Sequence, residues 1–163
     1  MSNTSFPGLL ANNQDIPATI KRTICSRIKT SNTNDTSLST NILLQLYRDR
    51  IFVVISQYGG KIGTLLQVTM ENSIIDNSKT YNVSTLLGSK RNDVILDIYA
   101  RQLLEVIESS TACKPSQLVN HDTQRILLLG ISLRDMSQEI FHHLIKEVMI
   151  MYEQAIENLD VSA

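Results

Sequence analysis

Apolar residues concentrate in short runs in the first half of the chain and recur with helical spacing in the second half. The clearest run is 51–55, Ile-Phe-Val-Val-Ile, after which glycines interrupt the sequence before apolar residues resume at Leu65. β-branched and aromatic residues favour strands, and a short glycine-containing connection favours a turn. This pattern predicts a β-hairpin between strands 51–55 and 64–70. We assign its turn to Gln57, Tyr58, Gly59, Gly60, Lys61 and Gly63.

Three further segments of the first half have strand character. Residues 16–28 carry an isoleucine at every fourth position, which fits a helix or an alternating strand, and their β-branched content favours the strand. Residues 41–58 are interpreted as one long strand, bent or bulged at the charged triplet 48–50. Residues 81–87 predict another strand, closed by Gly88. The polar segments 30–40, 71–79 and 109–124 predict loops.

The second half of the chain predicts two amphipathic helices separated by a strand at 125–133. Asn92 or Asp93 is the expected cap of the first helix, and Asp135 or Ser137 that of the second, which we expect to reach Ile156. The expected buried stripe of the first helix is Ile95, Ile98, Tyr99, Leu103, Val106 and Ile107. That of the second is Ile140, Phe141, Leu144, Ile145, Val148, Met151 and Tyr152.

The order of strands, helix, strand and helix predicts an α+β fold. Short connections between the early strands imply an antiparallel sheet of about six strands with both helices on one face. The length of the chain suits a single domain, which we place at 16–157. Residues 1–15 are expected to form a flexible extension and residues 158–163 a C-terminal tail.

Two of the predicted strands, 51–55 and 126–131, have no polar face. Because two helices on one side of a sheet leave its other side uncovered, a lone subunit would expose an apolar patch that soluble monomers rarely show. We therefore expect a second subunit to stack its sheet on this face, although the N-terminal segment is an alternative cover. The expected partner-contacting residues are Ile51, Val53, Ile55, Leu65, Ile126 and Leu128.

Charge and cysteine content exclude several classes of partner. The net charge is −1, so the chain has no excess of positive charge that would attract nucleic acid or an anionic membrane surface. The chain lacks a signal-like N-terminus and has no apolar run near the roughly 20 residues that span a bilayer. We expect Cys25 and Cys113 to be free thiols, since disulfides are rare in the cytosol. The expected location is cytoplasmic, and also nuclear.

No residue pattern argues for catalysis, a cofactor or a metal. Glycines 59, 60 and 63 would precede a strand, whereas a phosphate-binding loop leads into a helix. Glu139, His143 and Glu147 share a helix face, but a zinc-binding helix usually presents two histidines at that spacing, so we expect a solvated face. The triplet 48–50 and Lys61 are interpreted as solvated charges, with a partner contact as the alternative.

Three motifs resemble one known family. The first motif is an apolar strand, a Gln-aromatic-Gly turn and a Lys-apolar-Gly-Thr continuation, formed here by residues 51–59 and Lys61-Ile62-Gly63-Thr64-Leu65. The second motif is Leu86-Leu87-Gly88. The third is the strand 126–131, which leads through Leu133-Arg134-Asp135 to Ser137. Together they resemble the proteasome assembly chaperone 3 family over residues 22–152. The doubled glycine at 59–60 departs from the family pattern, and the longer loops are more similar to its fungal members.

The resemblance implies a chaperone that is not an enzyme. Members of this family pair with a related small subunit, proteasome assembly chaperone 4. The pair binds alpha-type subunit 5, promotes assembly of the alpha ring of the 20S core particle, and then dissociates. A small trafficking or scaffold adaptor that acts as a heterodimer is the alternative function. No matched motif assigns residues to the alpha-subunit contact.

Overall fold

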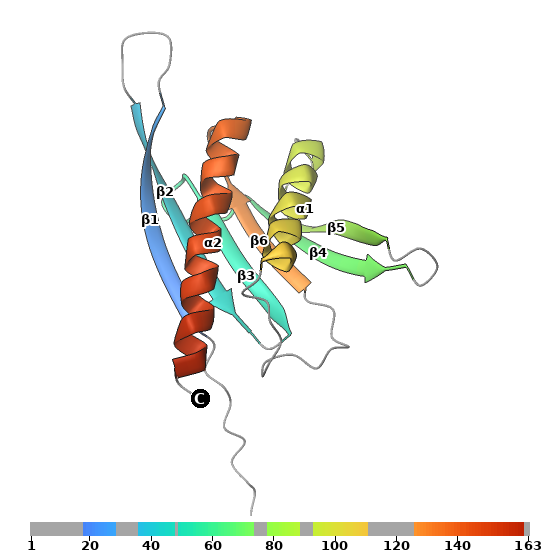
Figure 1. Cartoon of the computed structure of the whole chain (residues 1–163). Helices are drawn as coiled ribbons and strands as arrows, with labels where there is room; N and C mark the ends of the chain where they lie inside the picture. Colours follow the sequence, from blue (N-terminus) through green and yellow to red (C-terminus); the bar gives the residue numbers. More distant parts are fainter. Residues whose placement is uncertain are drawn as a thin grey trace, which may run out of the picture.

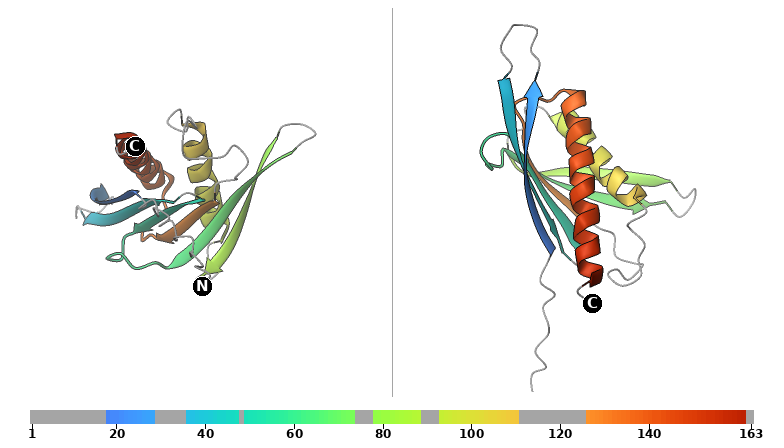
Figure 2. Two further views of the ribbon diagram at one scale, coloured as in Figure 1. Left: turned by 90° about the horizontal axis from the view of Figure 1, so that it is seen from below. Right: turned by 60° about the vertical axis from the view of Figure 1, so that its left-hand side comes forward.

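One mixed β-sheet carries two helices in the computed structural model, which describes residues 18–28, 36–47, 49–73, 78–88, 93–110 and 126–161 (Figure 1). Both helices lie on the same side of the sheet (Figure 2). The described elements are β1 (Ala18–Ile28), β2 (Thr36–Leu46), β3 (Arg50–Ser56), β4 (Thr64–Asn72), β5 (Lys79–Leu87), α1 (Asp93–Ser109), β6 (Ile126–Ser132) and α2 (Gln138–Val161). The predicted α+β class, the strand at 16–28 and the two helices are confirmed.

The strand order in the described sheet is β1-β2-β3-β6-β4-β5. The sequence predicted an antiparallel sheet, but the sheet is mixed, because β6 pairs in parallel with β3. The predicted hairpin between 51–55 and 64–70 is also wrong, since β6 lies between β3 and β4 and pairs with both. The connection 57–63 is long enough to cross one intervening strand, because neighbouring strands lie only about 4.8 Å apart. A strand that is apolar on both faces takes this central position.

Residues 41–58 form two strands rather than the single bent strand that the sequence indicated. β2 and β3 pair antiparallel, with Leu46 opposite Ile51. The N–H of Tyr47 donates a hydrogen bond to the carbonyl of Arg50 (2.9 Å) and closes the turn between them. Within this turn, the side chains of Asp49 and Arg50 form an exposed ion pair. The charged triplet therefore marks a solvated turn; Arg48 itself lies outside the described residues.

Other predicted boundaries shift as well. β2 begins at Thr36, inside the predicted loop 30–40, because pairing with β1 brings the Ser- and Thr-rich segment into the sheet. α2 continues to Val161 and so includes residues 158–161 of the predicted tail. The extension 1–15 and Cys113 lie outside the described residues.

Ser137 is the N-cap of α2. Its carbonyl accepts a hydrogen bond from the N–H of Phe141 (3.1 Å), and its own N–H donates to the Asp135 carboxylate (2.8 Å). Ser137 thus supplies the first acceptor of the helix and the Asp135 carboxylate accepts from the N–H of Ser137, so both residues that the sequence offered as caps lie at this helix start.

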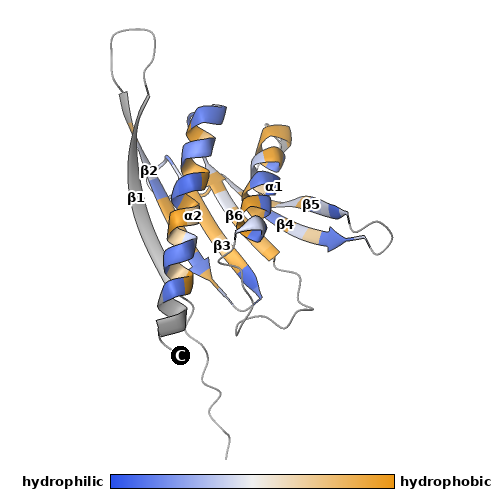
Figure 3. Cartoon of the chain, viewed as in Figure 1, coloured by the Kyte–Doolittle hydropathy of each residue, from blue (hydrophilic) through white to orange (hydrophobic). Residues whose placement is uncertain are grey.

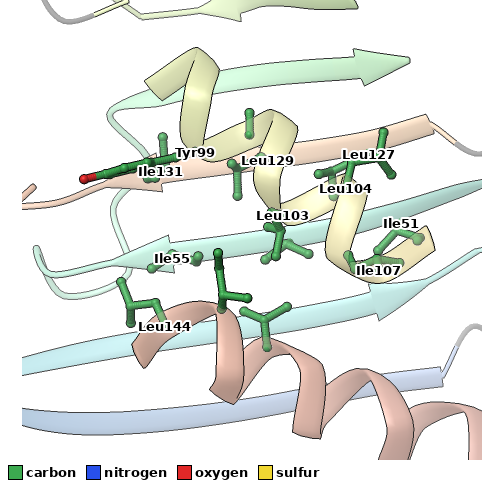
Figure 4. Packing of buried hydrophobic residues seen from close by; sticks show 14 of the residues in the cluster. Ile51, Ile55, Tyr99, Leu103, Leu104, Ile107, Leu127, Leu129, Ile131 and Leu144 are labelled. Carbon is green, nitrogen blue, oxygen red and sulfur yellow. The ribbon is translucent and has the colours of Figure 1, made fainter. Parts of the chain in front are cut away.

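The core lies between the sheet and the helices and consists of apolar residues of both. Figure 3 shows hydrophobic segments, in orange, on both helices and on the central strands. The rings of Tyr99 in α1 and Phe141 in α2 stack with centroids 3.7 Å apart, which joins the two helices. Leu103, Leu104 and Ile107 of α1 lie over the central strands (Figure 4). The predicted stripe of α2 is confirmed; that of α1 is partly wrong, because Ile95, Ile98 and Val106 are exposed and Leu96, Ala100 and Leu104 are buried instead.

Candidate functional site

Alternate residues of the central strands point to opposite faces of the sheet. Ile51, Val53 and Ile55 of β3 are at most 3% exposed and belong to the core beneath the helices. Phe52 and Val54 therefore point to the face without helices, which we call the open face. Across the β3–β6 ladder, Phe52 lies opposite Leu128, and Val54 lies opposite Gly130.

The sequence assigned Ile51, Val53 and Ile55 to the partner contact, and the structure corrects this assignment. All three pack under the helices, so a partner subunit does not reach them. A strand that is apolar on both sides gives no polar residue from which its inward face can be recognised. Leu65, Ile126 and Leu128 lie on the open face by register and are half-buried.

The open face is apolar at its centre. Leu43, Phe52, Val54, Leu128 and Leu65 come from the four adjacent strands β2, β3, β6 and β4 and face the same side. Ile126 and Gly130 of β6 also lie on this face, and other described positions of these strands carry uncharged polar residues such as Gln45 and Gln67. Charged residues appear only towards the strand ends, as Arg50 and Glu71. An apolar centre with a charged margin is the anatomy of a protein–protein interface.

The connection 57–63, which we call the β3–β4 loop, is anchored by the buried side chain of Gln57. This side chain is 4% exposed. Its Oε1 accepts hydrogen bonds from the backbone N–H groups of Arg134 (2.7 Å) and Asp135 (3.2 Å), and its Nε2 donates to Oγ1 of Thr40 (3.3 Å). The backbone N–H of Gln57 donates to the carbonyl of Ser132 (2.8 Å). One residue thus joins the ends of β3 and β6 to β2.

Beyond Gln57 the loop folds back over the open face. Oγ of Ser56 accepts a hydrogen bond from the N–H of Tyr58 (3.2 Å) and donates to the carbonyl of Lys61 (2.7 Å). Ile62 lies against Gly130, where a Cβ on the glycine would be 3.1 Å from Cδ1 of Ile62. The left view of Figure 2 shows the loop, in teal, on the side of the sheet away from the helices.

Glycines allow the tight packing at this end of the sheet. Gly59 and Gly60 have φ values of 66° and 86°, a region that favours glycine. At Gly88 (φ 115°), a Cβ would lie 2.7 Å from the carbonyl oxygen of Gly63 and 2.8 Å from Cα of Thr64. The three motifs that carry the family resemblance therefore meet here: the β3–β4 loop, Gly88, and the segment 133–135 after β6.

Several large side chains at this end are exposed. Tyr58 and Ile62 of the loop are each 46% exposed, and Leu87 beside Gly88 is 67% exposed. The guanidinium of Arg134 lies over the ring of Tyr58, 4.8 Å from its centroid, in a cation–π contact. Lys61 and Gly63 are also exposed. The loop is thus held firmly at its base and presents an aromatic, an aliphatic and a cationic side chain to the outside.

The described residues offer little for chemistry beyond binding. No group of three or more His, Cys, Asp or Glu side chains among them is placed to hold a metal ion, and His143 and Glu139 are exposed on α2.

Burial raises the pKa of both Tyr81 and Tyr99 above the usual value. The hydrogen bond with Arg50 lowers the pKa of the exposed Asp49. Neither helix in the described ranges is long and apolar enough to cross a membrane.

Comparisons with known proteins agree with this geometry. The family model described as "Proteasome assembly chaperone 3" matches residues 53–150, from β3 into α2. This range includes the second and third motifs and all of the first except Ile51 and Phe52. No curated protein matches the chain. A chain of the yeast complex described as "Crystal Structure of a Novel Chaperone Complex for Yeast 20S Proteasome Assembly" is 13% identical, with a TM-score of 0.52. The match covers 82% of this chain and 98% of the yeast chain, and it supports the fold.

Proposed function

The chain belongs to the proteasome assembly chaperone 3 family, a family of chaperones rather than enzymes, and we propose that it acts as one half of a heterodimeric proteasome assembly chaperone. Its partner in this proposal is a related small subunit of the proteasome assembly chaperone 4 type. The pair would bind alpha-type subunit 5, promote assembly of the alpha ring of the 20S core particle, and then dissociate. We place this activity in the cytoplasm and the nucleus.

The apolar, uncharged centre of the open face is the observation that carries the heterodimer. Phe52 and Leu128 face each other across the middle of the sheet, with Leu43 and Leu65 on the flanking strands β2 and β4. An apolar surface of this kind is favourable to bury, at about 25 cal/mol per Å² of apolar area. The family match supports a partner subunit as the molecule that covers it.

A second α+β subunit fits this face by its layer structure. Two sheets pack face to face about 10 Å apart, with interdigitating side chains between them. A partner that stacks its own sheet on the open face would give the order helices, sheet, sheet, helices. Each subunit would then have both sides of its sheet covered.

The heterodimer would leave the outer surface of the helices accessible to the proteasome subunit. On α1 this surface carries exposed apolar side chains at Val94, Ile95 and Ile98, which are 73%, 42% and 46% exposed. In this proposal the open face contacts the partner subunit, and the exposed surface of α1 stays available for contacts with other proteins.

Co-expression with the partner subunit and alpha-type subunit 5, followed by native mass spectrometry, tests the proposed function. The expected result is a binary chaperone complex and a ternary complex with the alpha subunit. Leu128→Asp should abolish the binary complex, because it places a charge at the centre of the open face. Ile98→Asp, which places the same charge on an exposed residue of α1, is the matched control and should keep the binary complex.

Recovery of vesicle or GTPase components from a lysate, with no proteasome alpha subunit among the captured proteins, would contradict this function and favour the adaptor alternative. Binary complex formation by Leu128→Asp at the wild-type level would contradict the open face as the pairing surface.

A further inference from the structure

The β3–β4 loop stands on the open face and divides it into two parts. Ser56 is 0% exposed and Val54 is 7% exposed, although both point to the face without helices. Their burial coincides with the folded-back loop, which hydrogen-bonds to Ser56 and places Ile62 beside Gly130. The other part, with Phe52, Leu128 and Leu65, has no such cover and is half-buried. A sheet that stacks on the open face therefore meets the loop at its margin.

The loop is ordered by bonds within the chain before any partner arrives. Gln57 makes three side-chain hydrogen bonds at its base, and Ser56 accepts and donates one each within the loop. A contact surface that is already fixed loses less conformational entropy on binding than a mobile one does. The exposed side chains on this fixed base are consequently well placed to contribute binding free energy.

The exposed residues are also of the types that dominate interfaces. Tyr and Arg are enriched among the residues whose truncation costs the most affinity. Here Tyr58 and Arg134 come from positions far apart in the sequence and are held against each other by the cation–π contact. The guanidinium of Arg134 also carries N–H groups that can bind a carboxylate with two hydrogen bonds.

We infer that the β3–β4 loop is a preformed rim of the heterodimer interface, which contacts the partner subunit through Tyr58, Ile62 and Arg134 and thereby selects it. This inference rests on the proposed function, because the partner is the subunit that stacks on the open face. The chemistry of the contact calls for a partner with an apolar side chain opposite Tyr58 and Ile62 and a carboxylate within reach of Arg134.

The test is the dissociation constant of the full-length heterodimer, measured for Tyr58→Ala, Arg134→Ala and the double variant. Each single variant is expected to raise the dissociation constant about tenfold or more. The double variant should raise it by less than the product of the two, because each residue holds the other. Arg134→Ala keeps the backbone N–H that Gln57 binds, so the base of the loop stays intact. Lys146→Ala, an exposed residue of α2 on the helix side of the sheet, is the control and should stay within about twofold of wild type.

The outcomes separate this inference from the function on which it rests. Dissociation constants within about twofold of wild type for both Tyr58→Ala and Arg134→Ala, together with loss of pairing in Leu128→Asp, would overturn the rim and leave the open-face heterodimer standing. Unchanged pairing in Leu128→Asp would overturn the heterodimer surface itself. A raised dissociation constant for Arg134→Ala that disappears at high salt would support a carboxylate as its partner group.

Discussion

The side-chain oxygen of Gln57, at the end of β3, accepts a hydrogen bond from the backbone N–H of Arg134, 77 residues further along the chain. This bond fixes the start of the β3–β4 loop to the segment that leads from β6 into α2. Both residues also serve the candidate site, since Arg134 holds Tyr58 through its guanidinium. The buried side-chain amide of Gln57 therefore holds the start of the exposed loop against the segment that follows β6.

Gln57→Ala should destabilise the protein by about 2 kcal/mol. The substitution removes the buried acceptor of the partly buried N–H groups of Arg134 and Asp135, and leaving such groups unsatisfied costs about 1–3 kcal/mol. The measurement is the free energy of unfolding in urea. Lys61→Ala, in the same loop but exposed, should change this free energy by less than about 0.5 kcal/mol. Equal stabilities of the two variants would show that Gln57 is not the anchor.

Gly88→Ala should be more damaging than Gly59→Ala. Both glycines have positive φ, which costs an alanine about 1 kcal/mol. Only at Gly88 would the added Cβ also meet backbone atoms, of Gly63 and Thr64, within 2.8 Å. We expect losses of about 3 kcal/mol and about 1 kcal/mol in thermal or urea unfolding. A loss at Gly88 no larger than that at Gly59 would contradict the close approach.

Val53→Asp and Leu128→Asp should fail in different ways. Val53 is 0% exposed beneath the helices, so a carboxylate there should abolish folding. Leu128 is half-buried on the open face, and its variant should fold but lose the partner. Circular dichroism combined with size-exclusion chromatography distinguishes the two results. A folded Val53→Asp chain would mean that the two faces have been assigned the wrong way round.

The protein should lose stability above pH 10, and Tyr99→Phe should reduce this loss. Burial, and secondly the charge of Asp135, raise the pKa of Tyr99 above 10.0. Between its unfolded and folded pKa values the native state holds a proton that the unfolded chain releases, so the free energy of unfolding falls as pH rises. Phenylalanine has no hydroxyl to titrate. Urea unfolding from pH 8 to pH 11 measures both slopes; identical slopes would contradict a buried neutral Tyr99.

The same substitution should lower stability at neutral pH as well. The hydroxyl of Tyr99 donates a hydrogen bond to the carbonyl of Met136, whereas phenylalanine keeps the ring stack on Phe141. The expected loss is about 1 kcal/mol. Burial also raises the pKa of Tyr81, so part of the alkaline slope should remain in Tyr99→Phe.

Local patterns predicted the elements better than their pairing. The stripe of α2, with Phe141, Leu144 and Val148, shows the helical period clearly, and Ser137 gives a clear start. The segment after Ile55 looks like a hairpin because glycines follow an apolar strand. No local sequence pattern predicts that β6, which follows α1 in the chain, lies between β3 and β4. Insertion of a later strand depends on long-range packing, which the spacing along the sequence does not encode.

The sequence predicted that a second apolar face exists, but not which residues of β3 lie on it. The apolar excess of 51–55 and 126–131 correctly indicated a second apolar face, yet it did not show that Ile51, Val53 and Ile55 point to the helices and Phe52 to the open side. Strand parity needs a polar residue as its reference, and these strands have none. The contact of Tyr58 with Arg134 joins two motifs that only the fold brings together.

Pairing through the open face is the central claim, and the most direct measurement is native mass spectrometry of the chain co-expressed with its proposed partner subunit. Wild type and Ile98→Asp should appear as one-to-one heterodimers, while Leu128→Asp should appear as a folded single chain. A heterodimer of undiminished abundance in Leu128→Asp, at equal expression, would contradict the claim.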